Sequence, residues 1–122
     1  MISDIFGQRE VREEVTLYEQ SEEECGAQYS GEWLKDTEIR QGRGKLVRKD
    51  GLSYSGYFLK DKFHLKGILI FASNDKFNRV QYSGSFKDGE FDGPGTMELT
   101  NGDSYWAIWY NGKERGQGKS EN

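Results

Sequence analysis

The sequence predicts an all-β fold in which β-hairpins repeat along one thin, elongated sheet. The chain of 122 residues is rich in rings and glycines, with seven Tyr, seven Phe, three Trp and 16 Gly against one Pro. Only 34% of its residues are apolar, which is little for the aliphatic core of a compact globule. A tyrosine-centred motif also recurs four times, and such repeats indicate stacked supersecondary units.

Each repeat begins with a tyrosine, and an aromatic residue follows four positions later. Three copies have glycine midway between the rings, whereas the fourth has Ala107. Residues two apart in a strand share a face, which we call the motif face, and the opposite side is the second face. A glycine between two rings leaves room for a ring from the neighbouring strand. The motif residues are Tyr29, Gly31, Trp33, Tyr54, Gly56, Phe58, Tyr82, Gly84, Phe86, Tyr105 and Trp109.

Turn signals separate the two strands of each hairpin. Asp88-Gly89 and Asn111-Gly112 tolerate positive φ and follow the motif directly, as Lys60-Asp61 does in the second repeat. A glycine pair of the form Gly-x-Gly then opens the second strand, except that Leu65 replaces the first glycine in the second repeat. Insertions of two residues in the first repeat and of five near residues 72–80 make the repeats uneven.

The two ends of the chain carry weaker patterns. Residues 1–14 form an acidic arm in which Ile5 and Val11, with Val15, could line a loose helical face, so an extended arm and a short helix are both open. We expect the repeat sheet over residues 15–118, with a half repeat at 15–28 and repeats that start at residues 29, 54, 82 and 105. A terminal repeat needs a cap, and the arm is the candidate. Residues 119–122 are expected to be a disordered tail.

Charge and cysteine content restrict the classes of partner. The net charge is -4, but residues 1–28 hold two basic and eight acidic groups, which leaves the remainder at +2. A nearly neutral body argues against nucleic acid as a partner. The single Cys25 cannot form an internal disulfide, and no apolar stretch or signal-peptide pattern is present. We therefore expect a reduced, cytoplasmic location.

The order Tyr-x-Gly-x-aromatic, turn, Gly-x-Gly, strand and Asp/Asn-Gly resembles the MORN repeat over residues 29–118. The resemblance implies a single-layer, twisted antiparallel sheet of stacked hairpins. It also implies a non-enzymatic scaffold or adaptor within a larger assembly, and small members of the family look most like components of the cytoskeleton, cilium or flagellum. The family's proposed role in recognising phospholipid headgroups provides an alternative function.

The second face carries the candidate site for a protein partner. Tyr57, Trp106, Ile108 and Tyr110 alternate out of register with the motif, and a lone hairpin sheet cannot bury both of its faces. Either the N-terminal arm or a partner should cover them, and we weigh these alternatives equally. The predicted partner-binding residues are Tyr57, Trp106, Ile108, Tyr110 and Trp109.

The alternative site for an anionic membrane surface is a basic cluster in the first repeat, although acidic residues interleave with it and favour a solvated surface. Its residues are Arg40, Arg43, Lys45, Arg48 and Lys49. No catalytic residue, cofactor or metal is expected, because no nucleophile has a base partner and His64 is the only histidine. Open sheet edges would allow a homodimer.

Overall fold

The computed structural model describes residues 5–18 and 21–121, with side chains described through residue 114. Within these residues the chain forms nine β-strands and no helix, all in one antiparallel sheet with the strands in sequence order. The predicted all-β fold of stacked hairpins is confirmed. The strands are β1 (Arg9–Thr16), β2 (Gln28–Leu34), β3 (Arg40–Val47), β4 (Ser53–Leu59), β5 (Lys62–Ile70), β6 (Arg79–Lys87), β7 (Glu90–Leu99), β8 (Ser104–Tyr110) and β9 (Lys113–Glu121).

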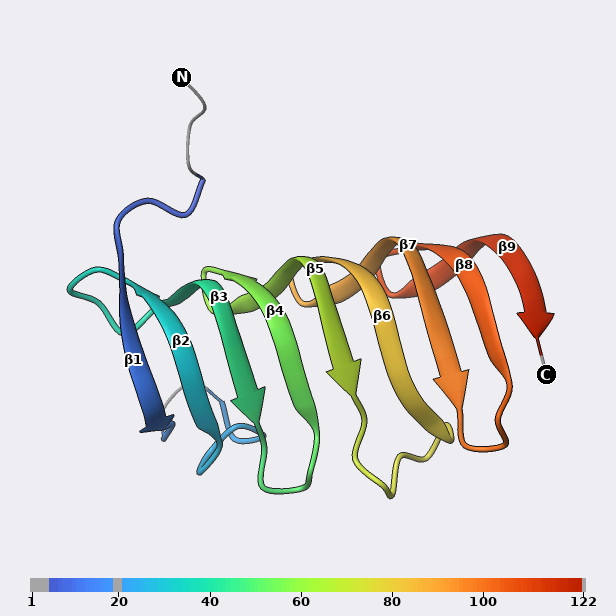
Figure 1. Ribbon diagram of the computed structural model, residues 1–122, viewed down its shortest axis with the longest axis horizontal. Coiled ribbons are helices and arrows are strands. Elements are labelled where there is room, and N and C mark those ends of the chain that lie inside the picture. Colours follow the sequence, from blue (N-terminus) through green and yellow to red (C-terminus); the bar gives the residue numbers. More distant parts are fainter. Residues whose placement is uncertain (1–4, 19–20, 122) are drawn as a thin grey trace.

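The sheet is open and elongated. Figure 1 shows the strands following one another along the longest axis, with β1 at one end and β9 at the other. The hairpins β2–β3, β4–β5, β6–β7 and β8–β9 correspond to the four repeats that start at residues 29, 54, 82 and 105. β1 adds a single leading strand before the first of them.

The N-terminal region differs from the prediction. Strand β1 begins at Arg9 and pairs with β2, so the helical alternative for residues 1–14 is wrong within the described residues, and residues 1–4 lie outside them. The sheet therefore starts before the expected residue 15. A bulge between Arg12 and Val15 inserts one extra residue, which moves Val11 and Val15 to opposite faces. In the sequence, however, their four-residue spacing also fits a helical period.

The C-terminal end differs as well. Residues 119–121 of the expected disordered tail belong to β9, where Glu121 pairs with Ser104 and Ser120 pairs with Tyr105. Asn122 lies outside the described residues. Strand pairing uses backbone groups, so a polar sequence such as this one can still extend a sheet.

The core lies on the motif face. Apolar side chains from the second strands of the first three hairpins, Leu46, Leu69 and Met97, pack among the motif rings. Neighbouring rings meet edge to face, as Tyr54 and Phe58 do with their centroids 5.1 Å apart. The rings with almost no exposed surface are Tyr29, Trp33, Tyr54, Phe58, Tyr82 and Phe86.

A row of glycines crosses the sheet beneath these rings. The register aligns Gly31, Gly44, Gly56, Gly67, Gly84, Gly95 and then Ala107 on successive strands from β2 to β8. A methyl group added to Gly95 would lie 2.1 Å from the hydroxyl oxygen of Tyr82. Tyr29 lies over Gly44 and Tyr54 over Gly67 in the same way. The ring thus lies mainly over the Gly-x-Gly glycine of the next strand, and its hydroxyl group also approaches the glycine of its own motif.

The buried tyrosines are also tied to their own strands. The hydroxyl groups of Tyr29, Tyr54 and Tyr82 each donate a hydrogen bond to the carbonyl oxygen three residues later, over 2.7, 2.8 and 2.9 Å. The strand register shifts just after the motif glycine in these strands, and such bulges bend a strand. The strands in Figure 1 curve along their length. Burial raises the pKa of Tyr82 to about 12, which keeps its hydroxyl a donor.

The hairpin turns follow the sequence signals. Lys60-Asp61, Asp88-Gly89 and Asn111-Gly112 each form a two-residue turn with positive φ at both positions. This backbone matches the right-handed twist of paired strands. The longer connection between β5 and β6 holds the predicted insertion, and there Asp75 accepts hydrogen bonds from the Arg79 side chain at 2.8 and 3.0 Å. Those bonds lower the pKa of Asp75 to about 2.

We predict that Gly95→Ala destabilises the protein by about 3 kcal/mol, because the new methyl group would overlap the Tyr82 ring. Urea unfolding followed by circular dichroism measures the change. Gly102→Ala is the matched control, since Gly102 has a positive φ of 92° but open space around its Cβ position. The control should lower the free energy of unfolding by only about 1 kcal/mol. Equal losses in the two variants would contradict a role for the ring contact.

We predict that Leu65→Gly stabilises the protein by about 1 kcal/mol by removing left-handed strain. Leu65 has φ of 58° and pairs with the second ring of the neighbouring motif, as the positive-φ residues Gly42 and Gly93 do. The Tm from thermal unfolding should rise. The reverse change, Gly93→Leu, should lower it. A lower Tm for Leu65→Gly would show that the Leu65 side chain contributes more than the strain costs.

Candidate functional site

The second face of β8 presents three of the predicted partner-binding residues to solvent. Trp106, Ile108 and Tyr110 have exposed fractions of 45%, 37% and 54%. Trp109 points the other way and is 6% exposed, packed against the rings of Tyr82 and Phe91. Trp109 is therefore part of the motif-face core, and the candidate surface on β8 consists of the other three.

Tyr57, the fourth residue predicted on this face, is covered by the N-terminal segment. Phe6 is 8% exposed and stacks on Tyr57, with ring centroids 5.6 Å apart and planes 12° from parallel. The buried Gln41 side chain donates a hydrogen bond to the Phe6 carbonyl oxygen over 2.8 Å. The arm thus covers the second face near β3 and β4, whereas the aromatic residues of β8 stay exposed. Coverage by the arm is therefore observed at Tyr57, and coverage of the β8 residues by a partner stays a prediction.

The exposed apolar surface also includes aliphatic residues that the sequence analysis missed. Val47, Ile68 and Ile70 are each more than two-fifths exposed on the second face. Val47 and Ile70 lie on either side of Ser53, to which both pair. In β5 the run Ile68-Leu69-Ile70 contains one motif-face residue, Leu69, between two second-face residues. Alternation about Leu69 was the signal that could have found them.

A shallow groove of about 460 Å³ crosses the second face from β3 to β8. Its floor includes the serines of the repeated Tyr-Ser-Gly motif, Ser55 and Ser83, because the residue between tyrosine and glycine points away from the motif face. Trp106 replaces that serine in the last repeat. The lining residues are Arg43, Ser55, Gly56, Tyr57, Lys66, Gly67, Ile68, Ser83, Gly84, Ser85, Pro94, Thr96 and Trp106.

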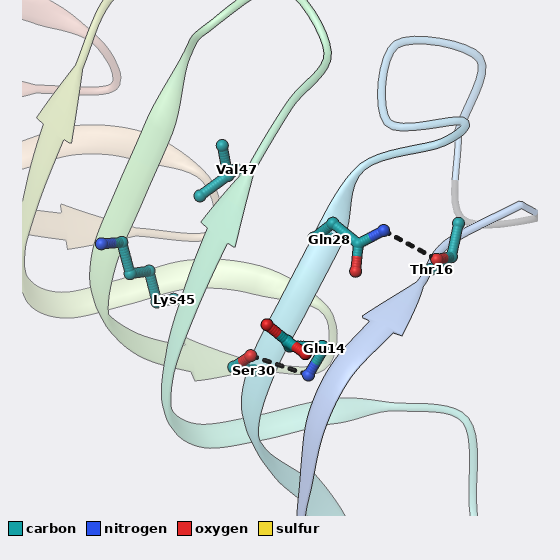
Figure 2. Close-up of a pocket in the computed structure, with 6 residues that line it drawn as sticks. All are labelled: Glu14, Thr16, Gln28, Ser30, Lys45 and Val47. Carbon is teal, nitrogen blue, oxygen red and sulfur yellow. Dashed lines mark hydrogen bonds between the residues drawn. The ribbon is translucent and has the colours of Figure 1, made fainter.

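A second depression lies over β1, β2 and β3 on the same face (Figure 2). The Glu14 backbone N–H donates a hydrogen bond to the Ser30 hydroxyl, and the Gln28 amide donates to the Thr16 hydroxyl, both over 2.8 Å. Figure 2 shows the Lys45 amine extending away from the Glu14 carboxylate. The polar groups of this depression bond to one another, and its two charged groups, on Glu14 and Lys45, do not converge on a common point.

The basic cluster of the first repeat is divided by the fold. The Arg40 side chain is 2% exposed, and its guanidinium donates to the Glu24 carboxylate at 2.9 and 3.3 Å and to Asp61 Oδ1 at 3.1 Å. It also lies over the Phe58 ring, 5.2 Å from the centroid. A lipid headgroup at the surface could not reach this guanidinium.

The other four basic residues point to different places. Arg48 pairs with Asp50 and, at 3.8 Å, with Glu23. Arg43 and Lys45 are exposed on the second face, and Lys49 is exposed in the turn after β3. The fold therefore leaves two of the five residues, Arg43 and Lys45, together on one exposed face.

Groups that could support catalysis or metal binding are sparse. In the part of the chain that the structure describes, no three His, Cys, Asp or Glu residues converge on a metal site, and no helix is long and apolar enough to cross a membrane. The His64 ring accepts a weak hydrogen bond from the Asp88 N–H over 3.4 Å, which places it in a turn contact. Cys25 is exposed.

The repeat geometry has a counterpart among known families. The model of the MORN repeat matches residues 54–76 and 82–104, which hold the hairpins β4–β5 and β6–β7. This chain is a MORN-repeat protein. MORN repeats are protein- or membrane-binding repeats and are generally non-enzymatic. No curated protein matches the chain. The hairpin that starts at Tyr29 has the same ring-over-glycine contact as the two matched MORN repeats.

We predict that Arg40→Met destabilises the protein by about 3 kcal/mol, because it leaves the Glu24 and Asp61 carboxylates without their common partner. Chemical denaturation measures the loss. Arg43→Met is the control, since Arg43 is exposed, and its stability should stay within about 0.5 kcal/mol of the wild type. An Arg40→Met variant whose stability equals that of the wild type would contradict a structural role for the buried arginine.

Proposed function

We propose that this MORN-repeat protein is a non-enzymatic adaptor that binds a partner protein on the second face of its sheet. The observation that carries the proposal is the exposed apolar surface there, with Trp106, Ile108 and Tyr110 on β8 and Ile68 and Ile70 on β5. Exposed aromatic clusters of this kind are common at binding surfaces, and Trp and Tyr are frequent hot spots.

The two faces of the sheet differ in a way that supports this choice. The motif face buries its rings against one another and against the aliphatic residues of the second strands. The second face keeps large apolar side chains in water over β5 and β8, and the arm covers only the region of Tyr57. Surface that the described chain leaves uncovered is available to a partner.

The membrane alternative has weaker support from the geometry. Arg40 is buried and Arg48 is paired with carboxylates, so the basic cluster offers fewer cations than its sequence suggests. Attraction to an anionic leaflet amounts to about 1 kcal/mol per basic residue near the surface, so a few cations bind weakly. We propose that the adaptor belongs to a cytoskeletal, ciliary or flagellar assembly, because small MORN-repeat proteins resemble components of such assemblies.

The double variant Trp106→Ser with Tyr110→Ser should lose its partner while it keeps its fold, because both side chains are exposed. Affinity capture from cells of the native organism, followed by quantitative mass spectrometry, should show at least one protein reduced about tenfold or more, as removal of a hot-spot aromatic typically costs 2 kcal/mol or more. Phe77→Ser is the control, since Phe77 is an exposed ring in the loop between β5 and β6.

An unchanged set of captured proteins in the double variant would contradict the proposed surface. Flotation with anionic vesicles provides the matching measurement for the membrane alternative. Vesicle binding that the double variant retains, together with no captured protein, would favour the membrane function instead.

A further inference from the structure

We propose that the groove across the second face binds an extended acidic peptide segment of the partner protein. Carboxylates of that segment would pair with Arg43 and Lys66, and a bulky apolar side chain would lie between Ile68 and Trp106. This inference rests on the proposed function and adds the chemical class of the partner.

The floor of the groove suits a peptide backbone. Ser83 and Ser85 on β6 and Thr96 on β7 lie between two apolar walls. Their side chains are short. Hydroxyl groups both donate and accept hydrogen bonds, so they can bond either N–H or C=O groups of an incoming chain. The neighbouring Gly67 and Gly84 contribute only backbone atoms to the floor, because their Cβ positions point to the motif face.

The apolar walls set the width of the groove. Ile68 on β5 and Trp106 on β8 occupy one row of the register, through Ser83 and Thr96. Three strand spacings separate them, which is roughly 14 Å between strand axes. The two side chains themselves fill part of that width. An extended chain fits there better than an α-helix, whose diameter is about 10–12 Å with side chains.

The charge of the groove is positive. Arg43 and Lys66 are its only charged lining residues. The nearby Glu32 carboxylate accepts a hydrogen bond from the Arg43 backbone N–H and pairs with Arg9. Within residues 5–18 and 21–114, neither side chain takes part in an ion pair, whereas Arg40, Arg48 and Arg79 all do. The Arg43 guanidinium lies over the Tyr57 ring, 5.5 Å from its centroid, which holds it beside the groove. Cations left unneutralised next to an apolar recess complement an acidic ligand with apolar anchors.

A peptide fits these features better than a membrane surface does. The groove places its two cations beside a row of hydroxyl groups and between two apolar walls. A bilayer would meet the two cations but would leave the hydroxyl row without hydrogen-bonding partners at the depth of the groove. Two cations alone attract an anionic leaflet only weakly.

Selection from a random peptide library displayed on phage tests the inference with the full chain as bait. Peptides of about 12 residues suffice, because they span roughly 40 Å when extended. We expect the enriched sequences to be net acidic and to contain a bulky apolar residue. In fluorescence polarisation, the affinity of the best synthetic peptide should fall about tenfold or more for Arg43→Glu with Lys66→Glu. It should also weaken between about 0.1 M and about 0.5 M salt.

Two further variants make the result specific. Arg43→Gln with Lys66→Gln should also weaken binding and guards against misfolding of the charge-reversed pair. Lys62→Glu with Lys76→Glu makes the same charge change at exposed positions outside the groove and should leave the affinity unchanged. Enriched peptides that are neutral or basic would overturn the inference. So would the absence of enrichment, or an affinity that the Gln pair does not change.

Vesicles of phosphatidylcholine and phosphatidylserine provide the other arm of the experiment. Vesicle binding that is lost in the Arg43→Glu, Lys66→Glu variant, without any acidic peptide enrichment, would overturn the inference in favour of a lipid. The proposed function is judged separately. If Trp106→Ser with Tyr110→Ser abolishes capture of a partner but the charge-reversed pair does not, the adaptor function stands and only the acidic nature of the segment is wrong.

Discussion

The contact between a tyrosine ring and the glycine of the next strand is the constraint on which this sheet depends. Tyr29, Tyr54 and Tyr82 each lie over a glycine that has no room for a side chain, and each hydroxyl group bonds its own strand three residues on. The ring therefore joins two strands and fixes a bend at once. A thin sheet gains a core in this way without a second layer, because the rings pack against one another along the motif face.

The same constraint explains why the second face is the one that could bind a partner. With the rings directed to the motif face, the alternation of the strand turns the intervening residue outward in every repeat. That residue is a serine in three repeats and Trp106 in the fourth. The framework and the proposed binding surface are thus encoded in alternate positions of the same strands. Side chains of the second face can differ between repeats, whereas the ring and glycine positions of the framework cannot.

The sequence predicted the hairpins, the turns and the motif-face core because these depend on local patterns: ring spacing, glycine offsets and Asp-Gly or Asn-Gly turns. It started the sheet only at residue 15 and missed most of β1, since the bulge before Val15 breaks the two-residue alternation. It placed Arg40 in a basic cluster, because linear order does not show that Glu24 and Asp61 meet at one guanidinium. For the same reason the sequence did not show that Phe6 stacks on Tyr57, because the two residues are far apart in the chain.

Arg40 has a consequence for how the repeats unfold. In a linear repeat array each unit contacts mainly its neighbours, so the ends can unravel one hairpin at a time. Arg40, at the start of β3, bonds both Glu24 before β2 and Asp61 in the turn after β4. One side chain thus connects three successive parts of the chain. We expect the first two hairpins to open together as one cooperative unit, while the C-terminal hairpins exchange their amide protons independently.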